Sequence, residues 1–342
     1  MARPRMAKSK PKYRVAIIGC GKIGALFESE PKREKPASHA GAVMANHRTE
    51  LIALVDTDTK NLAAARKLFP HAAGYASLTE CLKLEHPDIV IIATPSTARL
   101  APLKECVRFR IPMVVCEKPL AKSAREAKKM EAIVAKSGVT FVLNYHRRFS
   151  PLFARARASI TKGKIGTVQQ VTCYYSNGLY NNGGHTLDAL QYLLDDTFVS
   201  VVATKNAKNN TFPKGDVNVD ALLTTKKGTT ISLQSFDQKE YGIHDFRIYG
   251  TKRSIAITDY GVTLIETPVG QSRFVGIKQL DNLRAHTTRV PLSATRDVLA
   301  HAILCYEKRR DPSSSAKNGV EVLRVLETIT KSAKSAGKKM FV

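Results

Sequence analysis

The sequence predicts an α/β protein with two domains: a doubly wound parallel sheet, followed by an α/β domain with an open, mainly antiparallel sheet. From Tyr13 to about residue 143, short apolar runs alternate with helical patterns, which is typical of a parallel sheet covered by helices on both faces. After Phe149, segments alternate apolar with polar residues and are joined by turns such as 226–228, which favours antiparallel strands. A length of 342 residues fits two domains at about 150 residues each.

The first domain begins with an apolar strand at 13–18 that leads directly into a glycine-rich turn, G-C-G-K-I-G, from Gly19 to Gly24. The elements expected after it are a helix around 39–46, a strand at 50–55, helices at 61–68 and 78–84, a strand at 88–93, a helix at 101–108, a strand at 113–116, a helix at 123–137 and a strand at 139–143.

The second domain is predicted from its alternating segments. Strands are expected at 168–175, 198–206, 217–225, 229–236, 244–249 and 254–258, with a helical stretch opened by His185 and closing helices at 293–310 and 318–335. We expect residues 1–12 to form a flexible basic arm, 13–145 the first domain and 146–342 the second.

Composition excludes several classes of protein. Nowhere do 18 apolar residues run together, so no membrane span is expected, and we interpret the chain as a cytoplasmic protein. The six cysteines form no C-x-x-C pair, which favours buried thiols over a zinc site or a disulfide framework, and no metal site is predicted.

The net charge of +25, from 54 Lys and Arg against 29 Asp and Glu, would attract anions such as nucleic acid, anionic lipid or a phosphorylated substrate. The basic residues are spread along the chain without a dense helical stripe, so nucleic-acid binding is not the expected main function.

The glycine turn indicates a dinucleotide site of the Rossmann type. A tight turn between strand and helix lets the backbone approach a pyrophosphate: Gly19 would make the turn, Gly21 permit the approach and Gly24 allow close packing. Asp56 ends the second strand, where its carboxylate would accept both ribose hydroxyls, which favours NAD over NADP; Asp58 competes for this role. Because Asp56 lies well beyond the usual ~20 residues from the turn, the polar stretch 28–38 must be an excursion.

At this point the chain resembles the Gfo/Idh/MocA oxidoreductases over nearly its whole length from Tyr13. The motifs that carry the resemblance are, in order, G-C-G-K-I-G at Gly19, A-T-P-S at Ala93, C-E-K-P-L-A at Cys116, N-Y-H-R-R-F-S-P at Asn144, G-K-I-G at Gly163, G-G-H-T-L-D at Gly183 and N-G-V-E-V-L-R-V-L-E at Asn318.

The resemblance implies a nicotinamide dinucleotide cofactor, a substrate among sugars, inositols and nucleotide sugars, and a homo-oligomer, dimer or tetramer, that forms through the open sheet. The residues expected at the cofactor are Gly19, Gly21, Lys22, Ile23, Gly24, Asp56, Thr94, Pro95, Ser96, Arg99 and Glu117.

Lys118 and His185 are the catalytic candidates. Oxidation of an alcohol by nicotinamide needs one group that removes the hydroxyl proton and another that polarises the oxygen. Lys118 follows an apolar strand, at the carboxyl end of the parallel sheet, where such folds bind ligands; otherwise it would be a solvated lysine. His185 matches the family's acid/base histidine and has a pKa suited to proton transfer; otherwise it would cap a core helix. Asp188, one turn later, is expected to brace the helix or the ring, within the substrate site.

Two residues depart from the family pattern. Asn181 stands where many members carry an aspartate, so an Asp-assisted proton relay is absent and Asn181 would hydrogen-bond a substrate hydroxyl. Arg99 replaces a histidine, and we expect it to contact a cofactor phosphate or a substrate acid, or to face solvent.

The segment Tyr145, His146, Arg147 and Arg148 lies at the predicted domain junction. Two guanidinium groups there could clamp a diphosphate or carboxylate, or could form an interdomain salt bridge. We therefore expect Tyr145, Arg147 and Arg148 at the substrate. The two arginines favour an anionic sugar, such as a nucleotide sugar, as the substrate. The predicted function is an NAD-dependent sugar dehydrogenase, and the alternative is a non-catalytic sugar- or NAD-sensing regulator of the same fold.

Overall fold

The computed structural model describes residues 12–206 and 215–342, which divide into two compact units. The first unit comprises the chain up to Glu117 with residues 132–144 and 293–312, and the second comprises 118–131, 145–292 and 313–342. Residue 145 is therefore one of several points at which the chain passes from one unit to the other. The predicted basic arm lies, apart from Lys12, outside the described residues.

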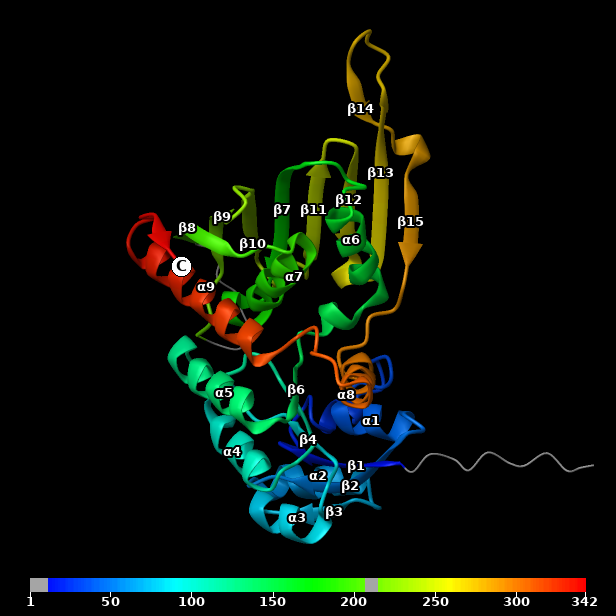
Figure 1. Cartoon of the computed structure of the whole chain (residues 1–342), viewed down its shortest axis with the longest axis vertical. Coiled ribbons are helices and arrows are strands. Elements are labelled where there is room, and N and C mark those ends of the chain that lie inside the picture. Colours follow the sequence, from blue (N-terminus) through cyan, green and yellow to red (C-terminus); the bar gives the residue numbers. More distant parts are fainter. Residues whose placement is uncertain (1–11, 207–214) are drawn as a thin grey trace, which may run out of the picture. The chain divides into compact units, whose positions relative to one another are not determined.

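The first unit is built on a parallel sheet of six strands in the order β3-β2-β1-β4-β5-β6 (Figure 1). The strands are β1 (Tyr13–Ile18), β2 (Thr49–Val55), β3 (Ala73–Tyr75), β4 (Ile89–Ile92), β5 (Met113–Cys116) and β6 (Thr140–Leu143). The chain starts in the middle of the sheet and extends to one edge and then to the other, which confirms the predicted doubly wound topology. Every residue of β4 and β5 is buried, as expected for strands covered on both faces.

The helices that accompany this sheet are α1 (His39–Ala45), α2 (Thr59–Leu68), α3 (Leu78–Glu85), α4 (Leu100–Arg108) and α8 (Arg296–Lys308), while α5 (Ala124–Ser137) has residues in both units. We expected α8 in the second domain, but it contacts β5, β6 and α1 in the first unit. Its buried face carries Val298, Leu299, Ala302 and Ile303, which need an apolar partner, and the edge of the parallel sheet supplies it.

The predicted excursion after the glycine turn interrupts a helix. A short 3-10 helix, Leu26–Ser29, follows the turn, residues 30–38 form neither helix nor strand, and α1 then begins at His39. The backbone N–H groups of His39 and Ala40 donate to the carbonyls of Ile23 and Gly24. Residues 30–38 are thus an insertion between the glycine turn and α1, and the hydrogen bonds join the two across it. This insertion explains the long spacing from the glycine turn to Asp56.

The second unit is built on a sheet of ten strands in the order β14-β13-β12-β11-β7-β10-β9-β8-β16, with β15 paired to β13. The strands are β7 (Val168–Ser176), β8 (Phe198–Lys205), β9 (Val219–Thr225), β10 (Thr230–Phe236), β11 (His244–Gly250), β12 (Arg253–Thr258), β13 (Thr263–Gln271), β14 (Lys278–Leu280), β15 (His286–Arg289) and β16 (Met340–Phe341). Among the described strands of this sheet, β7 and β10 pair in parallel and the other pairs are antiparallel, which confirms the predicted sheet.

Helices α6 (Pro151–Thr161), α7 (Gly184–Leu194) and α9 (Ala316–Lys334) pack with this sheet and with one another (Figure 1). A π-helical turn, Gly178–Gly183, precedes α7. Helix α6 and strands β3, β13, β14, β15 and β16 were not predicted from the sequence.

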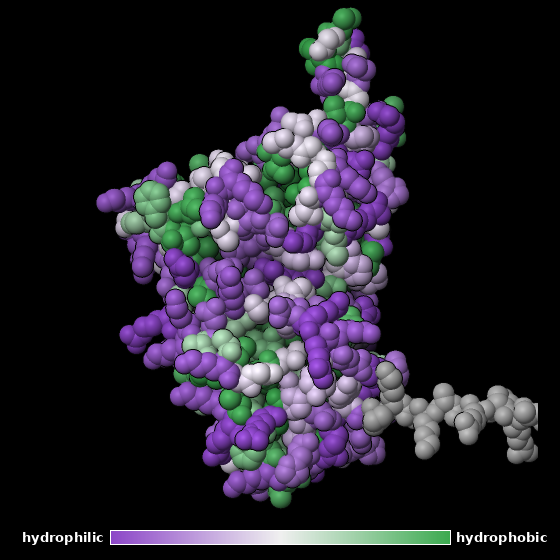
Figure 2. All heavy atoms as spheres, in the orientation of Figure 1, coloured by the Kyte–Doolittle hydropathy of each residue, from purple (hydrophilic) through white to green (hydrophobic). Residues whose placement is uncertain are grey.

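The β13–β14 hairpin ends in exposed apolar side chains: Phe274, Val275 and Ile277 are each more than half exposed, and apolar residues are visible at its tip in Figure 2. Elsewhere, all six cysteines are free and buried, as predicted, and no helix of the described chain is long and apolar enough to span a bilayer.

Candidate active site

The glycine turn between β1 and the following 3-10 helix has the predicted geometry. Gly19 has φ +93°, and a Cβ there would lie 2.7 Å from the carbonyl carbon of Ala93. A Cβ at Gly24 would lie 1.9 Å from the oxygen of Gly19, so this position requires close backbone packing. At Gly21 no atom would lie within 4 Å of an added Cβ. Gly21 therefore leaves open space beside the turn, as an approaching pyrophosphate would need.

A cavity of about 390 Å³ in the first unit adjoins this turn at the carboxyl ends of β1, β2 and β4. Gly19, Asp56 and Thr94 line it. The other predicted cofactor residues are not part of its lining: Gly21, Lys22, Ile23, Gly24, Pro95, Ser96, Arg99 and Glu117. Ala98, Ala101 and Pro102 add an apolar wall. A cavity of this size at the switch point of a doubly wound sheet, with a carboxylate at one end, fits the adenosine half of a dinucleotide.

Asp56 and Asp58 have separate roles. The Oδ2 of Asp56 accepts a hydrogen bond from the Cys20 N–H (2.7 Å) and its Oδ1 accepts one from the Asp58 N–H (2.9 Å), which fixes the carboxylate at the cavity wall. Asp58 is the N-cap of α2 and accepts from the N–H groups of Lys60 and Asn61. Of the two candidates, the structure thus brings Asp56 to the cavity and uses Asp58 to begin a helix.

Glu117 and Arg99 form a buried network at the ends of β4 and β5. The Oε1 of Glu117 accepts hydrogen bonds from His39 Nε2 (2.8 Å) and Asn144 Nδ2 (2.6 Å). Burial raises the pKa of Glu117, but the bonds from His39 and Asn144 and the charge of Arg99 outweigh it and lower the pKa to about 2.

Arg99 is 5% exposed, so the alternative that it faces solvent is wrong. Its Nε donates to the carbonyl of Thr94 (2.9 Å) and its Nη1 donates to the carbonyl of Glu117. The guanidinium thus joins the carbonyls of Thr94 and Glu117, which follow the neighbouring strands β4 and β5, whereas a neutral histidine has one ring N–H to donate.

In the second unit the two catalytic candidates come together. Lys118 Nζ donates to the backbone oxygen of Asn181 (3.2 Å) and to its Oδ1 (3.3 Å), so Lys118 is not a freely solvated lysine. Asn181 belongs to the π-helical turn that leads into His185, and Asp216 accepts its N–H (2.9 Å). Asn181 therefore positions Lys118; its predicted bond to a substrate hydroxyl remains a prediction.

His185 lies in the first turn of α7 and is 8% exposed. The ring of His146 lies 4.7 Å away and that of Tyr145 5.8 Å away, measured between centroids. Burial lowers the pKa of His185 well below its ordinary value, and the charge of Lys118 lowers it further, followed by His146 and Arg147. The imidazole is therefore neutral at neutral pH and can accept a proton.

Arg148 and Asp188 form a buried ion pair within the second unit. Arg148 Nε lies 2.9 Å from each carboxylate oxygen of Asp188, and Arg148 Nη1 donates to the carbonyl of Ser313 (3.1 Å). The Asp188 carboxylate is therefore held by Arg148, and the expected bracing of the helix or of the His185 ring by Asp188 stays a prediction. The Arg148–Asp188 ion pair lies within one unit and is not the interdomain bridge considered for Arg148.

Arg147 is 5% exposed, and neither its Nε nor its Nη1 has a hydrogen-bond partner in the described chain. Burial lowers the pKa of Arg147 to about 10, although the charges of Asp188 and Tyr260 oppose this effect. A buried guanidinium with donors to spare can still bind an anion.

Sequence reasoning missed three residues of these networks. His39 and Asn144 hold Glu117, and His244 on β11 lies 3.1 Å (Nε2 to Oγ1) from Thr186, the residue after His185. No local pattern singles them out, since each acts through a partner that is distant in the sequence.

Comparison with known proteins matches both halves of the chain to one family. The model of the oxidoreductase family with an NAD-binding Rossmann fold, Gfo/Idh/MocA, matches residues 13–145, and the model of the C-terminal α/β domain of that family matches residues 176–340. The inositol 2-dehydrogenase of Rhizobium meliloti (strain 1021) is 25% identical over 278 residues, which cover 75% of this chain and 79% of the relative.

Solved structures share the fold at lower identity. A levoglucosan dehydrogenase in complex with NADH and L-sorbose superposes with a TM-score of 0.79 at 18% identity, covering 97% of this chain and 99% of that chain. The WlbA dehydrogenase of Bordetella pertussis, in complex with NADH and UDP-GlcNAcA, superposes with a TM-score of 0.75 at 20% identity, with the same coverage. Because both family domains match in order on the expected folds, the chain belongs to the Gfo/Idh/MocA family of NAD(P)-dependent oxidoreductases, and its N-terminal domain is an NAD-binding Rossmann domain.

Proposed function

We propose that this oxidoreductase is an NAD-dependent dehydrogenase that acts on a hydroxyl group of a sugar, with His185 as the acid/base and Lys118 as the group that stabilises the substrate oxygen. The observation that carries the proposal is the position of Lys118: its Nζ donates to both oxygens of Asn181, in the π-helical turn that leads into His185, and its charge lowers the pKa of His185. An amine and a neutral imidazole in one site are the two groups that alcohol oxidation requires.

The reaction follows from the protonation states. The neutral His185 imidazole accepts the hydroxyl proton, while the Lys118 ammonium donates a hydrogen bond to the oxygen and offsets the negative charge that develops on it. Asn181 holds the ammonium in place through its two oxygens. In the reverse direction, His185 returns the proton to the carbonyl oxygen.

NAD, when bound, supplies the nicotinamide that takes up the hydride from the substrate carbon. Gly19, Gly21 and Gly24 would leave room for its pyrophosphate, and Asp56 would accept the ribose hydroxyls. A carboxylate held in that position disfavours the 2′-phosphate of NADP, because the two negative charges repel each other.

For the substrate we propose an anionic sugar, such as a nucleotide sugar. Arg147 supports this class, because its buried Nε and Nη1 have no hydrogen-bond partner among the described residues. The charges of Lys118 and Arg147 both act on His185, so the surroundings of the imidazole are positive. A negatively charged group on the substrate would compensate them. The WlbA dehydrogenase, whose structure contains UDP-GlcNAcA, has the same fold.

The test is a spectrophotometric screen. The purified protein is incubated with NAD and, separately, with nucleotide sugars, sugar acids, free aldoses and inositols, and absorbance of the reduced nicotinamide is followed. We expect turnover with at least one sugar and the highest kcat/KM with an anionic one. If kcat/KM is highest with a neutral polyol, the proposed anionic substrate class is wrong, but the dehydrogenase activity stands. Sugar binding without turnover of any compound would instead favour a non-catalytic sensor.

A further inference from the structure

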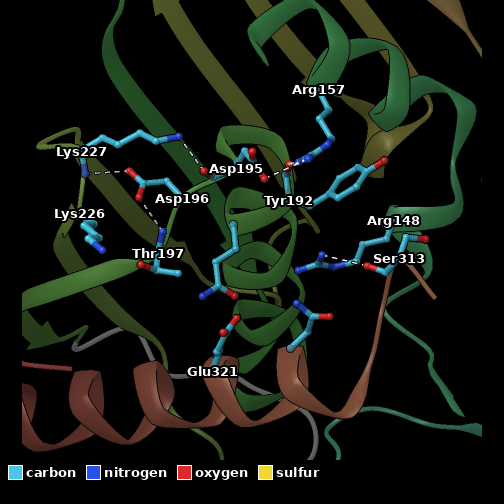
Figure 3. A pocket seen from close by; sticks show the side chains of 12 residues that line it. Arg148, Arg157, Tyr192, Asp195, Asp196, Thr197, Lys226, Lys227, Ser313 and Glu321 are labelled. Atoms are coloured by element: carbon cyan, nitrogen blue, oxygen red, sulfur yellow. Dashed lines mark hydrogen bonds and ion pairs between the residues drawn. The ribbon is translucent and has the colours of Figure 1, made fainter. Parts of the chain in front are cut away.

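A second large cavity, of about 670 Å³, lies within the second unit (Figure 3). It is lined by the end of α7 with the residues that follow it, the β9–β10 turn and the start of α9, and a smaller cavity of about 170 Å³ shares Gln191, Thr197 and Glu321 with it. Lys118, Asn181, His185 and Arg147 are not part of its lining. Its volume is that of a small-molecule site. Of the residues expected at the substrate, Arg148 alone lines it, so the cavity is separate from the two catalytic candidates.

The cations that line this cavity are already engaged, with one exception. Arg148 pairs with the buried Asp188, and Arg157 pairs with Asp195 (3.0 Å). Lys227 Nζ donates to the carbonyl of Asp195 (2.8 Å), as Figure 3 shows. Lys226 takes part in none of the ion pairs found in the described chain. One exposed lysine opposite a carboxylate does not make a phosphate site, which needs several converging donors.

The wall instead presents hydrogen-bond acceptors that lack donors. Gln191 is 8% exposed, and its Oε1 is buried at the cavity without a partner in the described chain. The Glu321 side chain projects from α9 towards the cavity (Figure 3), and its carboxylate makes no hydrogen bond or ion pair with another described residue. A buried acceptor without a donor destabilises the folded chain, so a ligand that supplies hydroxyl donors would bind here favourably.

We propose that this cavity is a second binding site, which takes an uncharged polyhydroxylated ligand, a sugar or a polyol. Gln191 and Glu321 would accept hydrogen bonds from its hydroxyl groups. An anion would meet the charge of Glu321, and a cation would meet Arg148 and Arg157, so neither fits this lining as well. The proposal does not depend on the reaction catalysed at Lys118 and His185.

The test compares ligand binding to matched variants by isothermal titration calorimetry, with myo-inositol, D-glucose, glycerol and inorganic phosphate as probes. Gln191→Leu and Glu321→Ala remove the two acceptors from different helices, and Lys331→Ala changes an exposed residue of α9 outside the cavity. We expect the Kd of at least one neutral probe to rise tenfold or more in both cavity variants and to stay unchanged in Lys331→Ala.

Thermal unfolding checks that the variants are folded. Because the two substitutions lie on separate helices, a local structural defect in one helix would not affect both variants. If no neutral probe binds, or if every neutral probe binds both cavity variants as it binds the wild type, the proposal is wrong. Phosphate binding that is lost in the two cavity variants, without any neutral probe behaving in this way, would also overturn it. Turnover in the sugar screen is a separate readout, so the outcome for the proposed function does not affect this one.

Discussion

His185 is a buried imidazole beside positive charges, and its protonation is the property on which the proposed chemistry depends. Its pKa is low first because burial disfavours the charged ring and then because Lys118 repels a second positive charge. Since the neutral form prevails at and well below pH 6.5, kcat/KM should not fall on the acid side until the pH is below that value.

Replacing Lys118 with methionine should raise the pKa of His185, because the substitution removes a positive charge and keeps an unbranched side chain of similar length. The measurement is an NMR titration of histidine ring resonances in the wild type and in Lys118→Met. The control is Lys122→Met, which changes an exposed lysine close by in the sequence. An unchanged His185 pKa in Lys118→Met would mean that the two groups do not interact.

We expect Asp56 to determine the preference for NAD over NADP. Asp56→Ala should weaken NAD binding by about tenfold, equivalent to about 1.4 kcal/mol, and should narrow the difference between NAD and NADP, because the charge that repels a 2′-phosphate is gone. The measurement is the Kd of each dinucleotide by calorimetry.

The neighbouring acid provides the control. Asp58→Ala removes the N-cap of α2 and should lower the free energy of unfolding by about 1 kcal/mol. The ratio of the Kd for NAD to the Kd for NADP should stay unchanged. A change of the ratio in Asp58→Ala and not in Asp56→Ala would reverse the assignment of the two residues.

At this scale the sequence identified candidate catalytic residues but not the partners of its buried arginines. Lys118 and His185 could be predicted because each lies in a recognisable motif. That Arg148 binds Asp188 and that Arg99 binds two strand-end carbonyls could not, because the partner of a buried arginine depends on which acceptors the fold buries with it.

At the scale of elements, the glycine turn combines a packing requirement with open space. Gly24→Ala should lower the midpoint of thermal unfolding by several degrees, because its Cβ would overlap the oxygen of Gly19. Gly21→Ala should leave the midpoint unchanged and weaken NAD binding tenfold or more, because its Cβ points into open space that the pyrophosphate needs. Calorimetry measures both quantities. Weak NAD binding confined to Gly24→Ala, with Gly21→Ala binding as the wild type, would contradict this role of the turn.

The parallel sheet was predictable apart from its short edge strand β3, and parts of the second sheet were not. The strand 113–116 was predicted with its observed bounds, since a short apolar run between helices has one interpretation in this fold. Helix α6 was missed because its arginines interrupt the apolar pattern, although two of them find carboxylate partners in the structure, Glu266 and Asp195. The β13–β14 hairpin was missed because exposed side chains at its tip follow no burial period.

At the scale of the whole molecule, the face of the second sheet opposite α9 carries exposed apolar side chains. Val202 and Leu222 are cross-strand neighbours on β8 and β9, with 38% and 52% of their surfaces exposed, while the residues on either side of Leu222 are buried. We propose that this face forms the contact of a homo-oligomer, since apolar neighbours on an open sheet gain free energy when a second copy covers them.

Leu222→Asp should convert the oligomer to monomers, because it would place a charge in the contact. The measurement is size-exclusion chromatography with multi-angle light scattering, and Lys331→Ala is again the matched exposed control. A wild-type protein that is monomeric, or an oligomer that Leu222→Asp leaves intact, would exclude this face as the contact.

The most direct test of the central claim is the turnover of Lys118→Ala on the substrate that the sugar screen identifies, with NAD affinity measured in parallel. The account predicts that kcat falls by about 10²- to 10⁴-fold while the Kd for NAD changes little, because Lys118 acts on the substrate oxygen. Turnover at the wild-type rate in Lys118→Ala would contradict the proposed chemistry.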